Sequence, residues 1–265
     1  MSMTAVIEPS NTEWVWGKQA VRELLRTNPP QVKQVWLSPS SKDPINREIQ
    51  ELCQKVKIPV AYKDRKAWEE IFRVPAHQSV AAQLKFAFRF TPLSDLLKSI
   101  QAAEDPAPVL LMIDHLQDPH NLGAIIRTAS GAGVRGIILP KDRTCPISGT
   151  VHKAAAGALE TLPLAQVTNL AQTIEALKKE GFWFLSLEAQ GGPSIYQLDL
   201  RVPLVVVIGS EGKGVSPLIL KKSDWVASIP MEGRLTSLNA SVACAVVLFE
   251  IRRQHKFFDR NLKKS

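Results

Sequence analysis

The chain has 265 residues, of which 45% are hydrophobic and 22% are charged. This composition is typical of a soluble globular protein with one large or two modest domains, and it excludes a low-complexity chain. No apolar run is long enough to span a membrane, and the first residues lack the pattern of a secretory signal. Three widely spaced cysteines predict neither a disulfide framework nor a zinc site, so we expect a cytoplasmic protein without a metal.

The net charge is +8 with a pI near 9.5, and the positive excess is uneven along the chain. Residues 13–90 hold 14 Lys and Arg against eight Asp and Glu, a net charge of +6. A basic surface of this kind favours a polyanionic partner, with nucleic acid as the first candidate, although basic surfaces without such a partner are common. We therefore expect the amino-terminal part to provide most of the attraction for nucleic acid.

The first 90 residues predict a small α/β domain. Apolar residues at helical spacing begin after Gly17, a strand-like alternation follows, and this succession repeats once before a last strand-like run. The expected helices are 17–27 and 47–56, and the expected strands are 32–38, 58–62 and 79–86. We assign 13–90 to this domain, after a flexible tail over 1–12.

Residues 91–108 are expected to be a linker. They end in AEDPAP, whose two prolines and two acidic residues are typical of a boundary, and the rest is compatible with one short helix. A second domain then covers 109–255, and a basic tail covers 256–265.

The second domain predicts an open parallel sheet with helices on both faces, because continuous apolar runs alternate with helix patterns throughout. The expected strands are 108–114, 135–140, 182–188, 203–209 and 225–230, and the expected helices are 121–132, 147–159, 169–179, 216–222 and a last one from Ala240. Ligands of such sheets bind at the carboxyl ends of the strands. The polar loops that follow the strands therefore form the candidate site.

One of these loops, GSEGKGVSP, is rich in glycine. Gly209, Gly212 and Gly214 allow sharp turns and close approach to a ligand. Their spacing matches neither a dinucleotide-binding loop nor a phosphate-binding loop, and Glu211 adds a negative charge. The loop therefore suits an uncharged or cationic ligand better than a phosphate, although by itself it is more simply interpreted as an ordinary strand-to-helix turn.

Two further loops lead into helices. Asp118 or Asn121 can cap the first helix, and Arg127 stands among apolar neighbours, where it needs an anion unless it extends to solvent. Ser237 or Asn239 can cap the last helix, but the stretch TSLNAS holds four polar side chains, more than one cap requires. This surplus predicts that the start of the last helix also lines a ligand pocket.

Together and in this order, the three loops resemble the three motifs of the SpoU (TrmH-type) RNA 2′-O-methyltransferases of the SPOUT superfamily. The likeness covers Val109 to Arg253, with DPHNLGAIIRTA as motif one, VVVIGSEGKGVSP as motif two and SIPMEGRLTSLNASVA as motif three. WGKQAVRELL resembles the opening of the small ribosomal-protein-like RNA-binding domain of the RlmB-type members, which methylate a guanosine ribose of bacterial 23S rRNA. Two departures, His115-Leu116 and Arg234-Leu235-Thr236, lie beside the motifs and bear on substrate choice.

The resemblance implies an α/β SPOUT domain whose carboxyl-terminal segment threads a loop to form a deep trefoil knot, against the general rule that chains are unknotted. It implies S-adenosylmethionine as the cofactor, 23S rRNA as the partner, and a homodimer whose active sites draw on both subunits. The cofactor is a sulfonium cation without phosphates, which agrees with the spacing of the glycines in motif two.

The resemblance also implies roles for single residues in catalysis. Arg127 would contact an RNA phosphate and help to deprotonate the 2′-hydroxyl, although an arginine is a poor base, so we give its phosphate-orienting role more weight. Asn121 would orient the substrate or the arginine, and Glu211 would hold a partner loop or helix. Ser237 and Asn239 would shape the cofactor and ribose sites.

The resemblance places the cofactor itself on the backbone of all three loops. The backbones around Gly209, Ile229 and Leu238 would receive the adenine and the ribose of S-adenosylmethionine.

Three other functions stay open at this point. A non-catalytic knotted RNA-binding or ribosome-assembly factor is disfavoured by the intact motif residues, and a titration with S-adenosylmethionine would distinguish it. A tRNA ribose 2′-O-methyltransferase of the same superfamily would usually lack the amino-terminal domain. A nicotinamide-dependent oxidoreductase is disfavoured by the glycine spacing.

Overall fold

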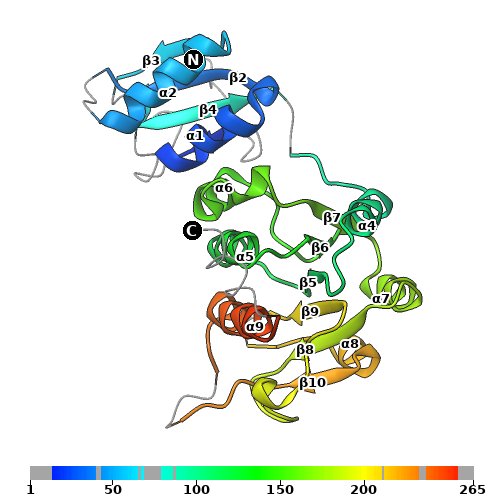
Figure 1. Ribbon diagram of the computed structural model, residues 1–265. Helices are drawn as coiled ribbons and strands as arrows, with labels where there is room; N and C mark the ends of the chain where they lie inside the picture. The colour runs from blue at the N-terminus through cyan, green and yellow to red at the C-terminus, as the bar shows by residue number, and fades with distance from the viewer. Residues whose placement is uncertain are drawn as a thin grey trace, which may run out of the picture. The chain divides into compact units, whose positions relative to one another are not determined.

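The computed structural model describes residues 14–39, 43–64, 67–68, 79–85, 88–210, 212–232 and 237–255. The tails expected over 1–12 and 256–265 therefore lie outside the described residues. Figure 1 shows the helices and strands of the chain. The chain forms two compact units, one of Met1–Arg89 with Pro146–Thr161 and the other of Phe90–Cys145 with Leu162–Ser265.

The first unit is built on a four-stranded sheet in the order β1-β4-β2-β3, in which β2 and β3 are parallel and the other pairs are antiparallel. Its elements are β1 (Trp14–Trp16), α1 (Lys18–Thr27), η1 (Pro29–Gln31), β2 (Val32–Leu37), α2 (Pro44–Lys55), β3 (Val60–Tyr62), β4 (Val80–Leu84), α6 (Gly149–Ala155) and η3 (Ala158–Glu160). The predicted small α/β domain is confirmed as an α/β fold.

The two faces of this sheet are buried in different ways. One face packs against α1 and α2 through aliphatic side chains such as Val15, Leu24 and Ile49. The other face carries a cluster of buried tryptophans, Trp14, Trp16, Trp36 and Trp68. Alternation along β1 produces this division, because neighbouring side chains of a strand point to opposite faces.

A helix over 147–159 is predicted within the second domain, and in the structure the segment Pro146–Thr161 groups with the first unit. It packs into the first unit, where Gly149 faces Trp16 so closely that a Cβ atom would overlap the indole ring. The helix also stops early, because Ala156 and Gly157 adopt left-handed backbone angles, with φ of 51° and 94°. The helical pattern of the sequence predicted neither the break nor the partner.

Helix α6 and η3 bury a histidine and a carboxyl group side by side, with 3.7 Å between His152 Nδ1 and Glu160 Oε1. Burial lowers the pKa of His152 from 6.5 to about 4. Burial, assisted by the negative charge of Glu23, raises the pKa of Glu160 from 4.5 to about 7. The free energy of unfolding therefore decreases as the pH falls below 6.5, because His152 is protonated first in the unfolded chain. It also decreases as the pH rises above 4.5, because Glu160 is ionised first in the unfolded chain. The two dependences oppose each other and offset between these values.

The variant Glu160→Gln should expose the contribution of His152. Without the carboxyl group, the melting temperature should fall as the pH is lowered from 6.5 towards 4, because His152 binds a proton in the unfolded chain but not when it is buried in the fold. Circular dichroism melts across this range, with the wild-type protein beside the variant, measure the difference. The double variant with His152→Asn should restore the wild-type profile, whereas parallel curves for wild type and Glu160→Gln would contradict this account.

The second unit contains a six-stranded sheet in the order β10-β8-β9-β5-β6-β7, and every neighbouring pair is parallel. Its elements are α4 (Leu93–Ala102), β5 (Val109–Ile113), α5 (Pro119–Gly131), β6 (Gly136–Pro140), β7 (Leu164–Val167), α7 (Leu170–Lys179), β8 (Trp183–Leu187), η4 (Ile195–Gln197), β9 (Leu204–Ile208), α8 (Pro217–Lys222), β10 (Trp225–Ala227) and α9 (Ala240–Gln254). The predicted open parallel sheet is confirmed. Strand β7 is an addition, because LAQV is too short to stand out in the sequence.

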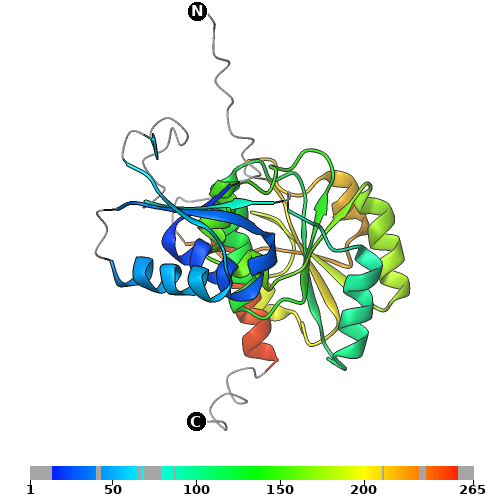
Figure 2. The same ribbon diagram turned by 90° about the horizontal axis from the view of Figure 1, so that it is seen from above.

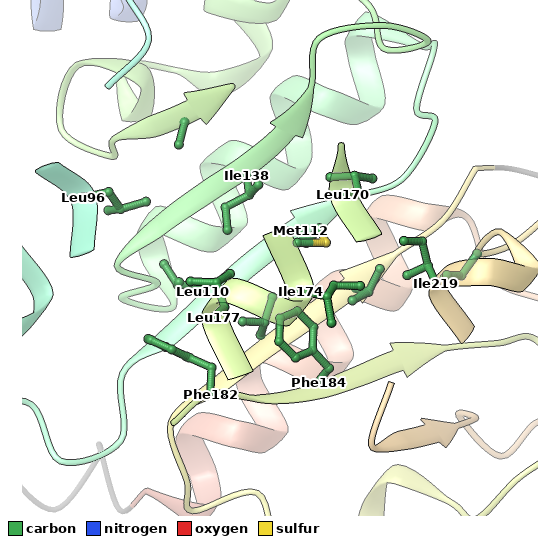
Figure 3. Close-up of a cluster of buried hydrophobic side chains, with 14 of the residues drawn as sticks. Leu96, Leu110, Met112, Ile138, Leu170, Ile174, Leu177, Phe182, Phe184 and Ile219 are labelled. Atoms are coloured by element: carbon green, nitrogen blue, oxygen red, sulfur yellow. The ribbon is translucent and has the colours of Figure 1, made fainter. Parts of the chain in front are cut away.

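Helices cover both faces of this sheet (Figure 2). Helices α4, α7 and α8 bury their apolar side chains against one face, in a core that includes Leu110, Met112 and Phe184 (Figure 3). Helices α5 and α9 pack together on the other face. The continuous apolar runs of the central strands follow from this arrangement, because both of their faces are covered.

The expected linker over 91–108 is corrected by this core. Helix α4 occupies most of it, with Leu96 and Ile100 buried against the sheet, so the interval is part of the second unit. Its apolar residues at helical spacing contained this signal, but the proline-rich and acidic end of the segment dominated the prediction.

Strands β5 and β9 are neighbours in the middle of the sheet. The next strand in the chain after β5, β6, pairs with the far edge of β5, and the strand before β9, β8, pairs with the far edge of β9. The strand order reverses at this point, and ligands of parallel sheets bind at such places. The trefoil knot stays a prediction. Among the described residues, no helix has both the length and the apolar character needed to cross a membrane.

Candidate functional site

A cavity of about 720 Å³ opens at the carboxyl ends of the central strands in the second unit. Its walls come from the segments that follow β8, β9 and β10 and from the start of α9. The predicted residues that line it are Gly209, Ile229, Ser237, Leu238 and Asn239. The structure thus gathers motifs two and three, from distant parts of the chain, around one cavity.

The glycine-rich loop after β9 is a tight turn. Ser210 and Gly214 exchange two backbone hydrogen bonds of 3.0 Å, so the loop closes on itself. A Cβ atom on Gly209 would overlap the backbone of Gly214 and Val215, so only glycine fits this position. Gly214 takes a left-handed backbone with φ of 64°. Glu211, which was assigned a holding role, lies outside the described residues.

Glu188 is a residue of the cavity that the sequence reasoning missed. It follows β8 directly, lines the cavity, and accepts a 2.9 Å hydrogen bond from the backbone N–H of Val215. The carboxylate therefore fastens the glycine-rich loop and also places a negative charge at the cavity wall. Its signal was available, because an acid at the carboxyl end of a buried strand is a candidate by the same rule that selected the other loops.

Asn121 and Asn239 are brought together from motifs one and three. The side-chain amide of Asn239 donates a 3.0 Å hydrogen bond to Oδ1 of Asn121, which is 8% exposed. Asn239 is also the N-cap of α9 and accepts from the backbone N–H of Ser241 at 2.9 Å. The capping position that the sequence left open between two residues is therefore Asn239, and its side chain serves two purposes.

Arg127 lies on α5, which begins at Pro119 with Asp118 as its N-cap. The arginine side chain is exposed, and the described residues that line the cavity include neither Arg127 nor Asn121. Asn121 links the helix to the cavity through Asn239. Arg127 is thus available to a ligand that approaches from solvent.

The far end of α5 is fixed to α9 as well. The guanidinium of Arg252, which is 9% exposed, donates to the backbone carbonyls of Ala132 and Gly133 at the end of α5. Burial lowers the pKa of Arg252, and the negative charge of Asp105 opposes that shift. The two helices that carry Asn121 and Asn239 are therefore joined at both ends, which holds the asparagine pair in register.

The cavity suits a flat, uncharged ring system attached to a cationic group. Leu187, Ile208, Ile229 and Leu238 give apolar surface, the surrounding backbone gives hydrogen-bonding groups, and Glu188 gives a negative charge. Among the described residues, no group of three or more His, Cys, Asp or Glu side chains could hold a metal ion.

This fold and site define a class of protein, an α/β protein with a ligand cavity at the switch point of a parallel sheet and a separate small α/β unit. Within that class, the chain belongs to the SpoU rRNA methylase family, whose model matches residues 108–249. A second model, for the substrate-binding domain of RNA 2′-O ribose methyltransferases, matches residues 14–89.

Three similar proteins illustrate the relationship. The chain is 42% identical, over 92% of its length and 98% of the relative, to the 23S rRNA (guanosine-2′-O-)-methyltransferase RlmB of Pseudomonas aeruginosa. The AdoMet-bound rRNA methyltransferase of Sinorhizobium meliloti has 25% identity and a TM-score of 0.72, over 91% of this chain and 87% of the other. The TrmH/SpoU tRNA modifying enzyme of A. aeolicus has 26% identity and a TM-score of 0.52, over 63% of this chain and 86% of the other.

Proposed function

We propose that this protein transfers a methyl group from S-adenosylmethionine to the ribose 2′-hydroxyl of a guanosine in 23S rRNA, in the cytoplasm. The observation that carries the proposal is a cavity made by motifs two and three, beside a motif-one helix, in a chain 42% identical over nearly its full length to a 23S rRNA guanosine methyltransferase. S-adenosylmethionine would supply the methyl group as a sulfonium electrophile.

The residues around the cavity have distinct tasks in this proposal. Gly209, Ile229 and Leu238 bring the backbone and the apolar walls against the adenosine, and Glu188 offsets the positive charge of the sulfonium. Ser237 and Asn239 line the same cavity, and in this proposal they shape the place that the ribose enters for in-line transfer.

The two motif-one residues have different tasks in this proposal, since Asn121 acts on Asn239 and Arg127 acts on the RNA. Asn121 holds the amide of Asn239 in one orientation through their hydrogen bond. Arg127 binds a phosphate of the RNA, since its guanidinium is exposed and matches the geometry of a phosphate. Arg127 is not assigned as the acceptor of the hydroxyl proton, because an arginine stays protonated at neutral pH.

The first unit binds the rRNA in this proposal. It holds most of the positive excess of the chain, and the model that matches it describes a substrate-binding domain. The tRNA alternative is disfavoured by the extent of the matches, because the tRNA modifying enzyme aligns with 63% of this chain and the rRNA enzyme with 91%.

Comparison of rRNA from cells with and without this gene tests the proposal. Ribose methylation, mapped across 23S rRNA and tRNA, should be lost at a guanosine of 23S rRNA and should reappear when the purified protein and S-adenosylmethionine are added. Loss at a tRNA nucleotide instead would favour the alternative. An undetectable affinity for S-adenosylmethionine in a calorimetric titration would favour a non-catalytic assembly factor.

We also propose a homodimer that is formed through α9. Val242 and Phe249 on this helix are 47% and 45% exposed, and with Val246 they follow a spacing of four and three residues along one face. Part of the apolar surface of this helix therefore faces outward. Such a stripe is stabilised when a second copy covers it.

The variant Phe249→Glu should be monomeric where the wild-type protein is dimeric, because a charge in the centre of an apolar interface loses its solvation. Sedimentation or light scattering measures the mass. Leu218→Glu, at a 57% exposed apolar residue on α8, is the matched control and should leave the dimer intact. A monomeric wild-type protein would contradict the proposal.

A further inference from the structure

A second cavity, of about 680 Å³, lies beside the first in the second unit and has a different character. The two cavities share Ser210, Lys213 and Gly214 of the glycine-rich loop. The other wall of the second cavity is the turn after β5, from His115 to Asp118, together with Arg143. Two cations, Arg143 and Lys213, therefore face this space.

The cationic wall is held in place by an ordered set of contacts. Asp114 is fully buried, and its carboxylate accepts a 2.7 Å hydrogen bond from the backbone N–H of Ser216 and pairs with Nδ1 of His115. A carboxylate only accepts, so Nδ1 faces it as the donor. Nε2 lies 3.4 Å from Nη1 of Arg143, which can only donate. The imidazole thus lies between the buried carboxylate and the guanidinium, and it orients Arg143.

The backbone at both ends of this contact is unusual. His115 and Arg143 each have φ of 63°, in the left-handed region of backbone conformation that residues other than glycine rarely adopt. The Arg143 segment is tied to the His115 turn by two bonds to the Leu116 carbonyl, from the Thr144 hydroxyl at 3.1 Å and from the Cys145 N–H at 3.0 Å. Strained conformations of this kind persist where the surroundings hold them, and they concentrate at ligand sites.

We propose that this second cavity is a subsite for a phosphate of the RNA backbone next to the methylated ribose, with Arg143 as its binding residue and His115 as a positioning residue. The inference rests on the proposed function. A guanidinium matches a phosphate with two parallel hydrogen bonds, and Lys213 adds a second positive charge. Asp118 also lines the cavity, but its carboxylate is engaged as the N-cap of α5.

The position of the subsite relative to the first cavity favours this ligand. In RNA, the ribose 2′-hydroxyl lies next to the 3′-phosphate of the same nucleotide. A cavity that shares three loop residues with the site of the methyl donor is therefore where that phosphate arrives when the hydroxyl is presented. The departure from the family pattern at His115-Leu116 is then the feature that orients Arg143.

Binding of a 23S rRNA transcript to the full-length protein without S-adenosylmethionine, measured by filter retention at several salt concentrations, tests the subsite. Arg143→Ala should weaken binding about tenfold and reduce the salt slope by about 0.7, the value for one phosphate contact on a single strand. Lys98→Ala removes an equal charge from an exposed position on α4, outside both cavities, and should leave affinity and slope unchanged. Affinity and slope for Arg143→Ala equal to those of Lys98→Ala would overturn the proposal.

Two further measurements separate this role from others. The affinity of Arg143→Ala for S-adenosylmethionine and its melting temperature should equal those of the wild type, and a loss of either would mean that Arg143 serves the cofactor or the fold instead. His115→Ala should weaken RNA binding in the wild-type background but not in Arg143→Ala, because it acts through the arginine; equal losses in both backgrounds would refute its positioning role. Absence of rRNA methylation by the wild type would overturn the proposed function, whereas the salt slope reports the subsite independently.

Discussion

Arg127→Ala is expected to lower the rate of methyl transfer by about 100-fold or more while the affinity for S-adenosylmethionine stays unchanged. Arg127 is exposed on α5, outside the residues that line the cofactor cavity, so its loss removes a contact to RNA and leaves the cavity walls intact. Single-turnover transfer to 23S rRNA measures the rate, and calorimetry measures cofactor affinity.

Two variants make this result specific. Arg127→Lys keeps the charge but loses the paired hydrogen bonds of the guanidinium, so it should recover only part of the rate. Arg135→Ala removes an exposed arginine that pairs with Asp105, and it should retain the wild-type rate. Equal loss of cofactor affinity and transfer in Arg127→Ala would mean that the arginine supports the cavity, and the assigned role would be wrong.

Gly209→Ala is expected to have the other large effect, on the cofactor cavity itself. The added methyl group would overlap the backbone of Gly214 and Val215, so the loop must open. The two backbone hydrogen bonds between Ser210 and Gly214 must then lengthen. Overpacking of this kind costs about 1–3 kcal/mol, which corresponds to a roughly 5- to 150-fold weaker affinity for S-adenosylmethionine if the cost falls on binding.

Gly131→Ala is the matched control for this prediction. Gly131 is the last residue of α5, and an added Cβ atom would meet nothing within 4 Å, so affinity and stability should be unchanged. Calorimetric titration of both variants, with melting temperatures beside them, separates weaker binding from a less stable fold. A Gly209→Ala variant with both wild-type affinity and wild-type stability would show that the loop does not need its closed form.

The sequence predicted the layered α/β fold because its signals are local. The apolar runs VLLMI and LVVVI favour strands covered on both faces, and the parallel sheet places the polar loops after them at one edge. The same local signals failed where a segment depends on a distant partner. The sequence of α4 indicates a linker, and only the buried contact of Leu96 with the sheet shows its packing; the contact between Gly149 of α6 and Trp16 is likewise absent from the local pattern.

The candidate site divides in the same way. The resemblance to the family motifs pointed to Gly209, Ile229 and Leu238, and all three line the cavity. The bond between Asn121 and Asn239 joins positions 118 residues apart and could not be read from either helix alone. The contact between His115 and Arg143 across two loops was equally hidden.

By itself, the sequence determined most of the strands and helices, where polar loops follow them, and where positive charge accumulates, because these properties depend on neighbouring residues. Only the tertiary structure decided that Glu188 fastens the glycine-rich loop, that Arg143 faces a second cavity, and that Pro146–Thr161 packs with the first unit. The physical reason is that such contacts depend on chain segments that meet only after folding, when strand order and side-chain packing bring them within hydrogen-bonding distance.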